Sequence, residues 1–142
     1  MSATGGCLCG AVRVTVSPLP DRMGACHCGQ CRRWTGGGPL YAVPVRSIEI
    51  EGEDATRSYR ASDWGERVFC GTCGTTLWWK MQGKPVHHVA AGLLDDQSAL
   101  HVADEIFVDM RPGWMPPFPG ANQSTEAEEM AKLAADLEGE TP

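Results

Sequence analysis

The 142-residue sequence contains no long hydrophobic run and comparatively few basic residues. No stretch approaches the roughly 20 apolar residues of a membrane-spanning helix, so we expect no membrane partner. Lys and Arg number 12 against 18 Asp and Glu, a formal charge of −6, which argues against sequence-independent binding to nucleic acid. The first residues lack the charged and apolar regions of a secretory signal. We therefore expect a cytoplasmic protein.

The acidity is concentrated at the C-terminal end of the chain. Residues 122–142 hold six acidic side chains against the single base Lys132, so they carry −5 of the formal charge. Residues 1–121 hold 12 acidic and 11 basic side chains and are nearly neutral. The length suits one domain, which commonly has about 100–150 residues. We expect that domain at residues 1–121, followed by an acidic helix or tail at residues 122–142.

Much of the chain has the residue pattern of short β-strands. The pattern predicts strands at residues 11–16, 40–45, 47–51, 67–69, 75–80, 86–91 and 105–109. Four prolines in residues 112–119 predict an irregular segment that packs its aromatic side chains onto the body. A short amphipathic C-terminal helix follows, because Thr125 and Glu128 resemble a capping box and apolar residues recur at helical spacing. Those apolar residues are Ala127, Met130, Ala131, Ala134 and Leu137.

Seven cysteines fall into three clusters. They are a first pair (Cys7 and Cys9), a three-cysteine cluster (Cys26, Cys28 and Cys31) and a second pair (Cys70 and Cys73). A closed set of disulfides would leave one thiol over, and in a reducing cytosol clustered cysteines more commonly bind metal. Residues two or three positions apart on a tight turn can direct two thiolates at one ion. Cysteines used as small buried hydrophobes would not form three clusters, so the spacing indicates metal binding.

Seven thiolates divide naturally into four and three. A structural zinc usually has four protein ligands, whereas a catalytic zinc has three and keeps one position open. In one arrangement Cys28 and Cys31 join the second pair in a ribbon-type site. In the other, the first and second pairs combine and the three-cysteine cluster forms an open site. Local economy favours the second arrangement, since three ligands lie within six residues, but the spacing leaves both open.

Three cysteine-containing segments resemble the signatures of a known family. They are residues 6–12 (GCLCGAV), 26–32 (CHCGQCR) and 69–74 (FCGTCG). Residues 59–62, 91–96 and 106–114 resemble the weaker motifs of the same family, in the same order. The sequence thus resembles the glutathione-dependent formaldehyde-activating enzymes, which include the centromere protein V-like domains. The resemblance covers about residues 5–118.

This resemblance implies a mostly β fold of the β-tent type, built from short antiparallel strands and followed here by the short C-terminal helix. It implies two Zn²⁺ ions per chain. A structural zinc would be held by Cys7, Cys9, Cys70 and Cys73, and a catalytic zinc by Cys26, Cys28 and Cys31. The implied activity is that of a carbon–sulfur lyase similar to S-hydroxymethylglutathione synthase. Its partners would be a thiol such as glutathione and formaldehyde or a related small aldehyde.

Two further residues are candidates for substrate binding. Arg32 matches the family motif and follows the last cysteine of the cluster; its guanidinium suits carboxylates, of which glutathione has two. Trp114, among its prolines, is a candidate lid over a pocket. His27 lies between two expected ligands, so its side chain should point away from the metal. Two other functions compete with the lyase: a zinc-stabilised protein-binding module without catalysis, and a redox- or metal-responsive cysteine cluster.

Overall fold

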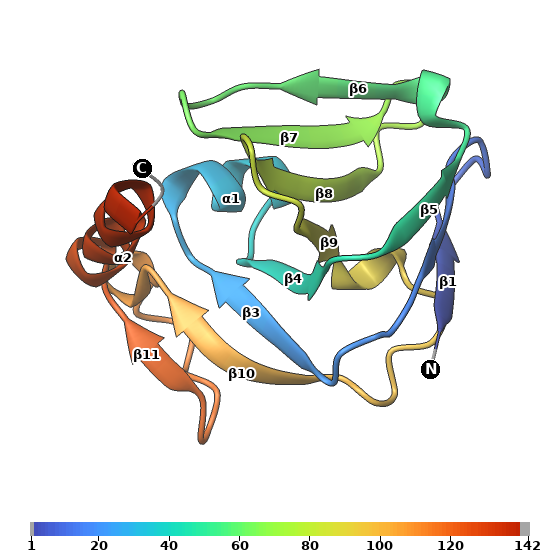
Figure 1. The fold of residues 1–142 in the computed structure, drawn as a ribbon. Coiled ribbons are helices and arrows are strands. Elements are labelled where there is room, and N and C mark those ends of the chain that lie inside the picture. Colours follow the sequence, from blue (N-terminus) through green and yellow to red (C-terminus); the bar gives the residue numbers. More distant parts are fainter. Residues whose placement is uncertain (1, 140–142) are drawn as a thin grey trace. The chain divides into compact units, whose positions relative to one another are not determined.

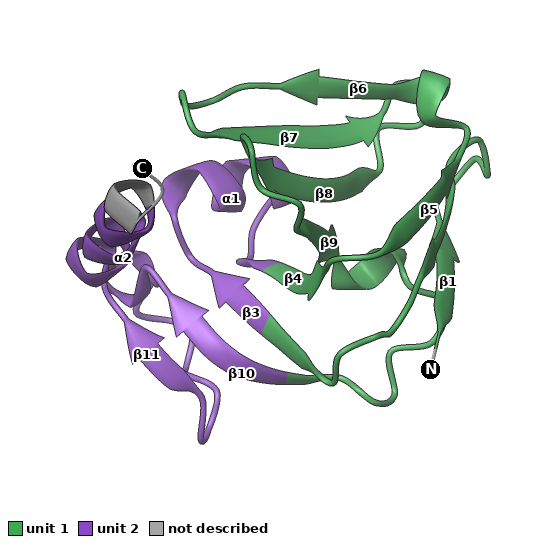
Figure 2. Cartoon of the chain, in the orientation of Figure 1, with its two compact units in different colours: residues 1–23, 41–101 green, residues 24–40, 102–142 purple. Residues whose placement is uncertain are grey.

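The computed structural model describes residues 2–139 and divides the chain into two compact units (Figures 1 and 2). Unit 1 comprises residues 1–23 and 41–101, and unit 2 comprises residues 24–40 and 102–142. Within residues 2–139, no helix has both the length and the apolar character needed to cross a bilayer.

Unit 1 is built from antiparallel strands. β1 (Ala3–Gly6), β2 (Arg13–Val16) and β5 (Ile48–Glu51) form a three-stranded sheet in the order β1-β2-β5. A second group of strands is hydrogen-bonded in the order β4-β9-β8-β7-β6. These strands are β4 (Leu40–Val45), β9 (His87–Ala90), β8 (Thr76–Met81), β7 (Gly65–Cys70) and β6 (Thr56–Tyr59).

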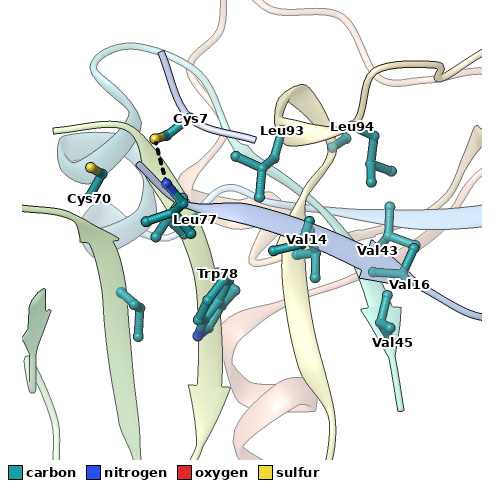
Figure 3. Packing of buried hydrophobic residues seen from close by; sticks show 14 residues of the cluster. Cys7, Val14, Val16, Val43, Val45, Cys70, Leu77, Trp78, Leu93 and Leu94 are labelled. Atoms are coloured by element: carbon teal, nitrogen blue, oxygen red, sulfur yellow. Dashed lines mark hydrogen bonds between the residues drawn. The ribbon is translucent and has the colours of Figure 1, made fainter. Parts of the chain in front are cut away.

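The core of unit 1 draws side chains from both groups of strands. Alternation along β2 buries Val14 and Val16, which share one face of that strand. They belong to the same apolar cluster as Val43 and Val45 of β4 and Leu77 of β8. Cys7 and Cys70 also belong to this cluster, and Figure 3 shows both beside Leu77. The buried core therefore supports the backbone on which these two cysteines lie.

Unit 2 combines strands with both α-helices of the described chain. β3 (Arg22–Cys26), β10 (His101–Ile106) and β11 (Asn122–Ser124) lie in the order β11-β10-β3, with β10 and β11 parallel. α1 (Gly29–Thr35) follows β3, and α2 (Glu126–Gly139) follows β11. The amide of His27 donates to the carbonyl of Ile106 (3.0 Å), so the loop between β3 and α1 is tied to the end of β10.

The predicted fold class is confirmed: the chain is mostly β, its strands are short and mainly antiparallel, and a short helix follows them. The strand predicted at residues 40–45 matches β4. The strand predicted at residues 105–109 is wrong in position, because β10 spans His101–Ile106 and Val108–Met110 form a 3-10 turn. Phe107 has a left-handed φ of 58°, which ends the extended conformation there.

The C-terminal helix is present, but its predicted apolar face is not packed. Thr125 and Glu128 form the expected capping box, with the Thr125 amide donating to Oε1 of Glu128 (2.9 Å) and the Glu128 amide to Oγ1 of Thr125 (3.2 Å). Four of the five apolar residues, Ala127, Met130, Ala131 and Ala134, are exposed. The Leu137 side chain lies outside the described part. Polar contacts at its N-terminal end hold α2, including a hydrogen bond from the Glu126 amide to Asp109 (3.0 Å).

Leu77→Ala should lower the free energy of unfolding by about 2–5 kcal/mol, because Leu77 is fully buried in the core of unit 1. Leu8→Ala removes the same atoms from a side chain that is 88% exposed and should cost less than about 0.5 kcal/mol. Urea unfolding of the two metal-loaded variants measures both. Equal destabilisation of the two would contradict the assigned core.

Candidate functional site

The structure divides the seven cysteines into groups of four and three. The ligand atoms of Cys7, Cys9, Cys70 and Cys73 lie within 4.8 Å of one another, and all four residues belong to unit 1. The Sγ atoms of Cys26, Cys28 and Cys31 form a second group of the same compactness in unit 2. This grouping is the one that the family resemblance implied. Among the described residues, Cys28 and Cys31 group with Cys26, which differs from the ribbon-type alternative.

Two similar turns build the four-cysteine cluster. The Gly10 amide donates to the carbonyl of Cys7 (3.1 Å), and the Gly74 amide donates to the carbonyl of Cys70 (2.8 Å). Both glycines have φ of 80°, a left-handed conformation that other residues rarely adopt. Each turn thus closes on a glycine directly after its second cysteine. This places both sulfur atoms of a pair on the same side of the turn.

The four-cysteine cluster has the dimensions of a metal site. Four sulfur atoms about 2.3 Å from one tetrahedral ion lie about 3.8 Å apart. The Sγ atoms of Cys7 and Cys9 are 3.6 Å apart, and those of Cys9 and Cys70 are 3.8 Å apart. These distances exceed the roughly 2.05 Å of a disulfide bond. The residues present therefore fit a tetrahedral metal ion.

Hydrogen-bond donors favour thiolate over thiol in part of the cluster. At Cys9 the opposite holds: the Ala11 amide lowers the pKa, but burial and the sulfurs of Cys7, Cys73 and Cys70 outweigh it and raise the pKa to about 11. The amide of Val12 donates to Sγ of Cys7 (3.3 Å), the bond marked in Figure 3. The hydroxyl of Thr75 lies 3.1 Å from Sγ of Cys73, and together with the Thr75 amide it lowers the pKa of Cys73 to about 5. Since the thiolate is the form that binds metal, these contacts prepare the cluster for a cation.

The three-cysteine cluster lies at the junction of β3 and α1. Cys26 is the last residue of β3, and Cys28 is the N-cap of α1, where its Sγ accepts a hydrogen bond from the Cys31 amide (3.3 Å). α1 ends at Gly36, which has φ of 91° and donates its amide to the carbonyl of Arg32 (3.0 Å). The sequence analysis missed this seven-residue helix. The glycine just after it is a helix-end signal, but two turns are too short for a clear apolar period.

The close spacing of the three thiols favours binding of a cation. Hydrogen bonds that the Cys26 thiol donates to the sulfurs of Cys28 and Cys31, then burial, and then the charges of those two residues raise the pKa of Cys26 well above its ordinary value. A bound divalent cation would relieve this, since it holds coordinating thiols as thiolates. In the described part of the chain no fourth Cys, His, Asp or Glu ligand atom joins the group. Cys26 and Cys28 remain partly exposed. The cluster thus fits a metal with three protein ligands and an accessible side.

Unit 2 also contains a small hollow of about 20 Å³, which is lined in part by sequence neighbours of the three-cysteine cluster. Both predicted substrate-binding residues line it, Arg32 from α1 and Trp114 from the irregular segment. Besides Gly37 and Gly38, the other lining residues are His27, Pro39, Pro112 and Met115. Residues 112–119 are irregular, as predicted, but Trp114 is 73% exposed and does not pack onto the body. The cysteine side chains do not line the hollow.

Glu105 is a residue of this region that the sequence analysis missed. It is fully buried on β10, and its Oε1 lies 2.8 Å from Nε2 of His27. Burial raises the pKa of Glu105, but hydrogen bonds from Gln123, His27 and the Phe118 amide outweigh it and lower the pKa below its ordinary value. An acidic residue is normally expected at the surface. The available signal was its alternation with Ala103, which is buried on the same strand.

Comparisons with known proteins agree with these observations. The model of the family described as glutathione-dependent formaldehyde-activating enzyme matches residues 2–110. A relative from Halomonas elongata that carries the name of this enzyme is 32% identical over 127 residues, covering 81% of this chain and 80% of that protein. An uncharacterized lyase from Schizosaccharomyces pombe is 26% identical over 109 residues, covering 76% of this chain and 80% of that protein.

A crystal structure of a Rhodobacter sphaeroides protein shares the fold, with a TM-score of 0.56 at 23% identity. The match covers 86% of this chain and 99% of that one. The family match spans well over half of the sequence and includes all seven clustered cysteines. This chain therefore belongs to the glutathione-dependent formaldehyde-activating enzyme family.

Proposed function

We propose that the protein is a zinc-dependent carbon–sulfur lyase of the S-hydroxymethylglutathione synthase type. In the forward direction the sulfur of a thiol such as glutathione bonds to the carbon of formaldehyde or a related small aldehyde. The thiol proton passes to the carbonyl oxygen, which becomes a hydroxyl group. In reverse the carbon–sulfur bond breaks. The observation that carries this proposal is the three-thiol group, which has three ligands where the other cluster has four.

Zinc suits both clusters, since thiolate is a soft ligand and Zn²⁺ takes tetrahedral sulfur sites. Cys7, Cys9, Cys70 and Cys73 would hold one ion in a closed, structural site. Cys26, Cys28 and Cys31 would hold the other and leave one position for an exchangeable ligand. When bound there, zinc supplies a position that keeps an incoming thiol deprotonated or polarises a carbonyl oxygen. The partial exposure of Cys26 and Cys28 gives a substrate access to this side.

The volume of the hollow limits which part of a substrate it can hold. A volume of about 20 Å³ is room for about one water-sized group. It suits a one-carbon unit but not a whole tripeptide, so most of the thiol substrate would lie across the open surface beside the hollow. Arg32 and Trp114 are both exposed there. Arg32 would bind a carboxylate of the thiol through paired hydrogen bonds, and Trp114 would cover the reacting group.

The location and partners follow from the same chemistry. The cysteines are free, and a reducing compartment keeps such thiols available for metal. We therefore propose a cytoplasmic enzyme that acts on a small thiol and a small aldehyde.

Cys28→Ser should remove one metal equivalent and leave the fold of unit 1 intact, because Cys28 belongs to the three-cysteine cluster alone. Cys70→Ser should instead remove the other equivalent and lower stability strongly, since Cys70 is fully buried in the core and structural zinc contributes folding free energy. Metal analysis and circular dichroism of both variants measure this. Loss of both metals and of the fold in Cys28→Ser would favour a purely structural role for the three-cysteine cluster.

Arg32→Ala should raise the KM for glutathione by about tenfold, because a charge-assisted hydrogen bond to a carboxylate contributes about 1.5–3 kcal/mol. The measurement is exchange of S-hydroxymethylglutathione followed by NMR, with the uncatalysed exchange subtracted. Arg33→Ala is the matched control: Arg33 is also exposed, but its guanidinium donates to the carbonyl of Gly29 (3.3 Å) and it does not line the hollow. An equal effect of both substitutions would argue against a carboxylate site at Arg32.

No acceleration by the zinc-loaded wild-type protein over the uncatalysed exchange would overturn the lyase proposal. In that case a zinc-stabilised binding module would account for the same two clusters.

A further inference from the structure

The Glu105 carboxylate is a buried centre on which several segments of unit 2 converge. Its side chain is fully buried, and four donors surround its two oxygens. Oε1 lies 2.8 Å from Nε2 of His27 and 3.3 Å from Nη1 of Arg111. Oε2 accepts from the amide of Phe118 (2.9 Å) and from Nε2 of Gln123 (2.7 Å). Every acceptor position of this carboxylate is therefore directed at a different residue.

Stability alone is a weak reason for this arrangement. A carboxylate is costly to bury, and replacing a buried ion pair by an apolar side chain of similar volume is often neutral or stabilising. What an apolar side chain cannot do is hold four donors at one point. The segments that carry these four donors indicate the role of Glu105 better than its contribution to stability does.

Two of the donors are the two ends of one irregular segment. Arg111 begins the 111–118 segment and Phe118 ends it, and both are bonded to Glu105. Within the segment the Met115 amide donates to the carbonyl of Pro112 (3.0 Å), which closes a tight turn around Trp114. The carboxylate therefore pins the base of the loop that carries Trp114, Pro112 and Met115 to the hollow.

The third donor, His27, belongs to a different segment that also lines the hollow. His27 lies between Cys26 and Cys28, and it lines the hollow together with Arg32. One carboxylate thus ties the cysteine loop to the segment that carries Trp114. Removing it would loosen the 111–118 segment from the His27 side chain, although the His27 amide would still be bonded to the carbonyl of Ile106.

We propose that Glu105 is a positioning residue for the thiol substrate: by holding His27, Arg111 and the Phe118 amide at one point, it keeps the hollow formed before the substrate arrives. This inference rests on the proposed lyase function. A preformed site binds more tightly because the cost of ordering its loops is met during folding. The consequence of losing Glu105 is a weaker hold on the thiol rather than a lost metal or a slower chemical step.

Glu105→Gln tests this directly. Glutamine has one acceptor oxygen, and its amide nitrogen would face donors, so up to two of the four hydrogen bonds are lost. We expect the KM for glutathione to rise by about tenfold and kcat to change by less than about threefold, a split that marks lost binding rather than lost chemistry. The metal content should stay at two ions per chain. Glutathione binding, measured by calorimetry on the zinc-loaded protein, should weaken by a similar factor.

Hydrogen exchange supplies a readout that does not depend on turnover. The amides of the 111–118 segment should exchange faster in Glu105→Gln than in the wild type, whereas those of β7 and β8 in unit 1 should not change. Asp104→Asn is the matched control, because it removes a neighbouring charge on β10 whose carboxylate accepts from Asn122 (2.9 Å). It should leave the KM and the exchange of the 111–118 segment at wild-type values.

Arg111→Met is a second, milder variant if Glu105→Gln does not fold. The Arg111 side chain is 19% exposed, and its loss releases only one end of the 111–118 segment. It should raise the KM by a smaller factor, about threefold, and speed exchange in the same segment. An unchanged KM and unchanged exchange in these variants, in a wild type that is active, would overturn the positioning role while leaving the lyase function standing. So would loss of metal together with a fall in kcat. A wild type that neither binds glutathione nor accelerates exchange overturns both proposals.

Discussion

Seven cysteine sulfur atoms are gathered at two points, and much of the structure supports this arrangement. In unit 1, cysteines more than sixty residues apart in the sequence share one cluster. Cys7 and Cys70 lie in the same apolar core as the valines of β2 and β4. The packing that forms the core therefore also brings these thiols together. A metal ion at this point would cross-link two distant turns, and the core would hold those turns in place for it.

The two clusters have contrasting surroundings. The four-cysteine cluster rests on apolar side chains and is closed by two glycine turns. The three-cysteine cluster has few residues in its own framework, a strand end and a seven-residue helix. Polar contacts centred on Glu105 hold the region next to it, where the hollow and the exposed Arg32 and Trp114 lie. Exposure of the cysteines does not separate the two clusters, because Cys9 is exposed while Cys26 and Cys28 are half-buried. The difference lies in the number of sulfur ligands, four against three.

Sequence patterns predicted those parts of the structure that depend on local spacing. Alternation located the strand at residues 40–45, and cysteine spacing identified all seven cysteines as candidate ligands, whereas their division into four and three was implied by the family resemblance. Two local features and one long-range feature were missed. The left-handed Phe107 shortened the last predicted strand, and α1 was too short to show a period. Glu105 was missed because its burial depends on donors from residues 27, 111, 118 and 123, which only the folded chain brings together.

The Sγ atom of Cys28 has two roles. Its Sγ is one of the three candidate metal ligands, and it also accepts the Cys31 amide as the N-cap of α1. An N-cap contributes about 1 kcal/mol to the helix that it begins. If a metal binds at this sulfur, its occupancy would be thermodynamically linked to the order of the first turn of α1. Because Arg32 lies on that helix, ligand exchange at such a metal and the position of the Arg32 guanidinium would be coupled.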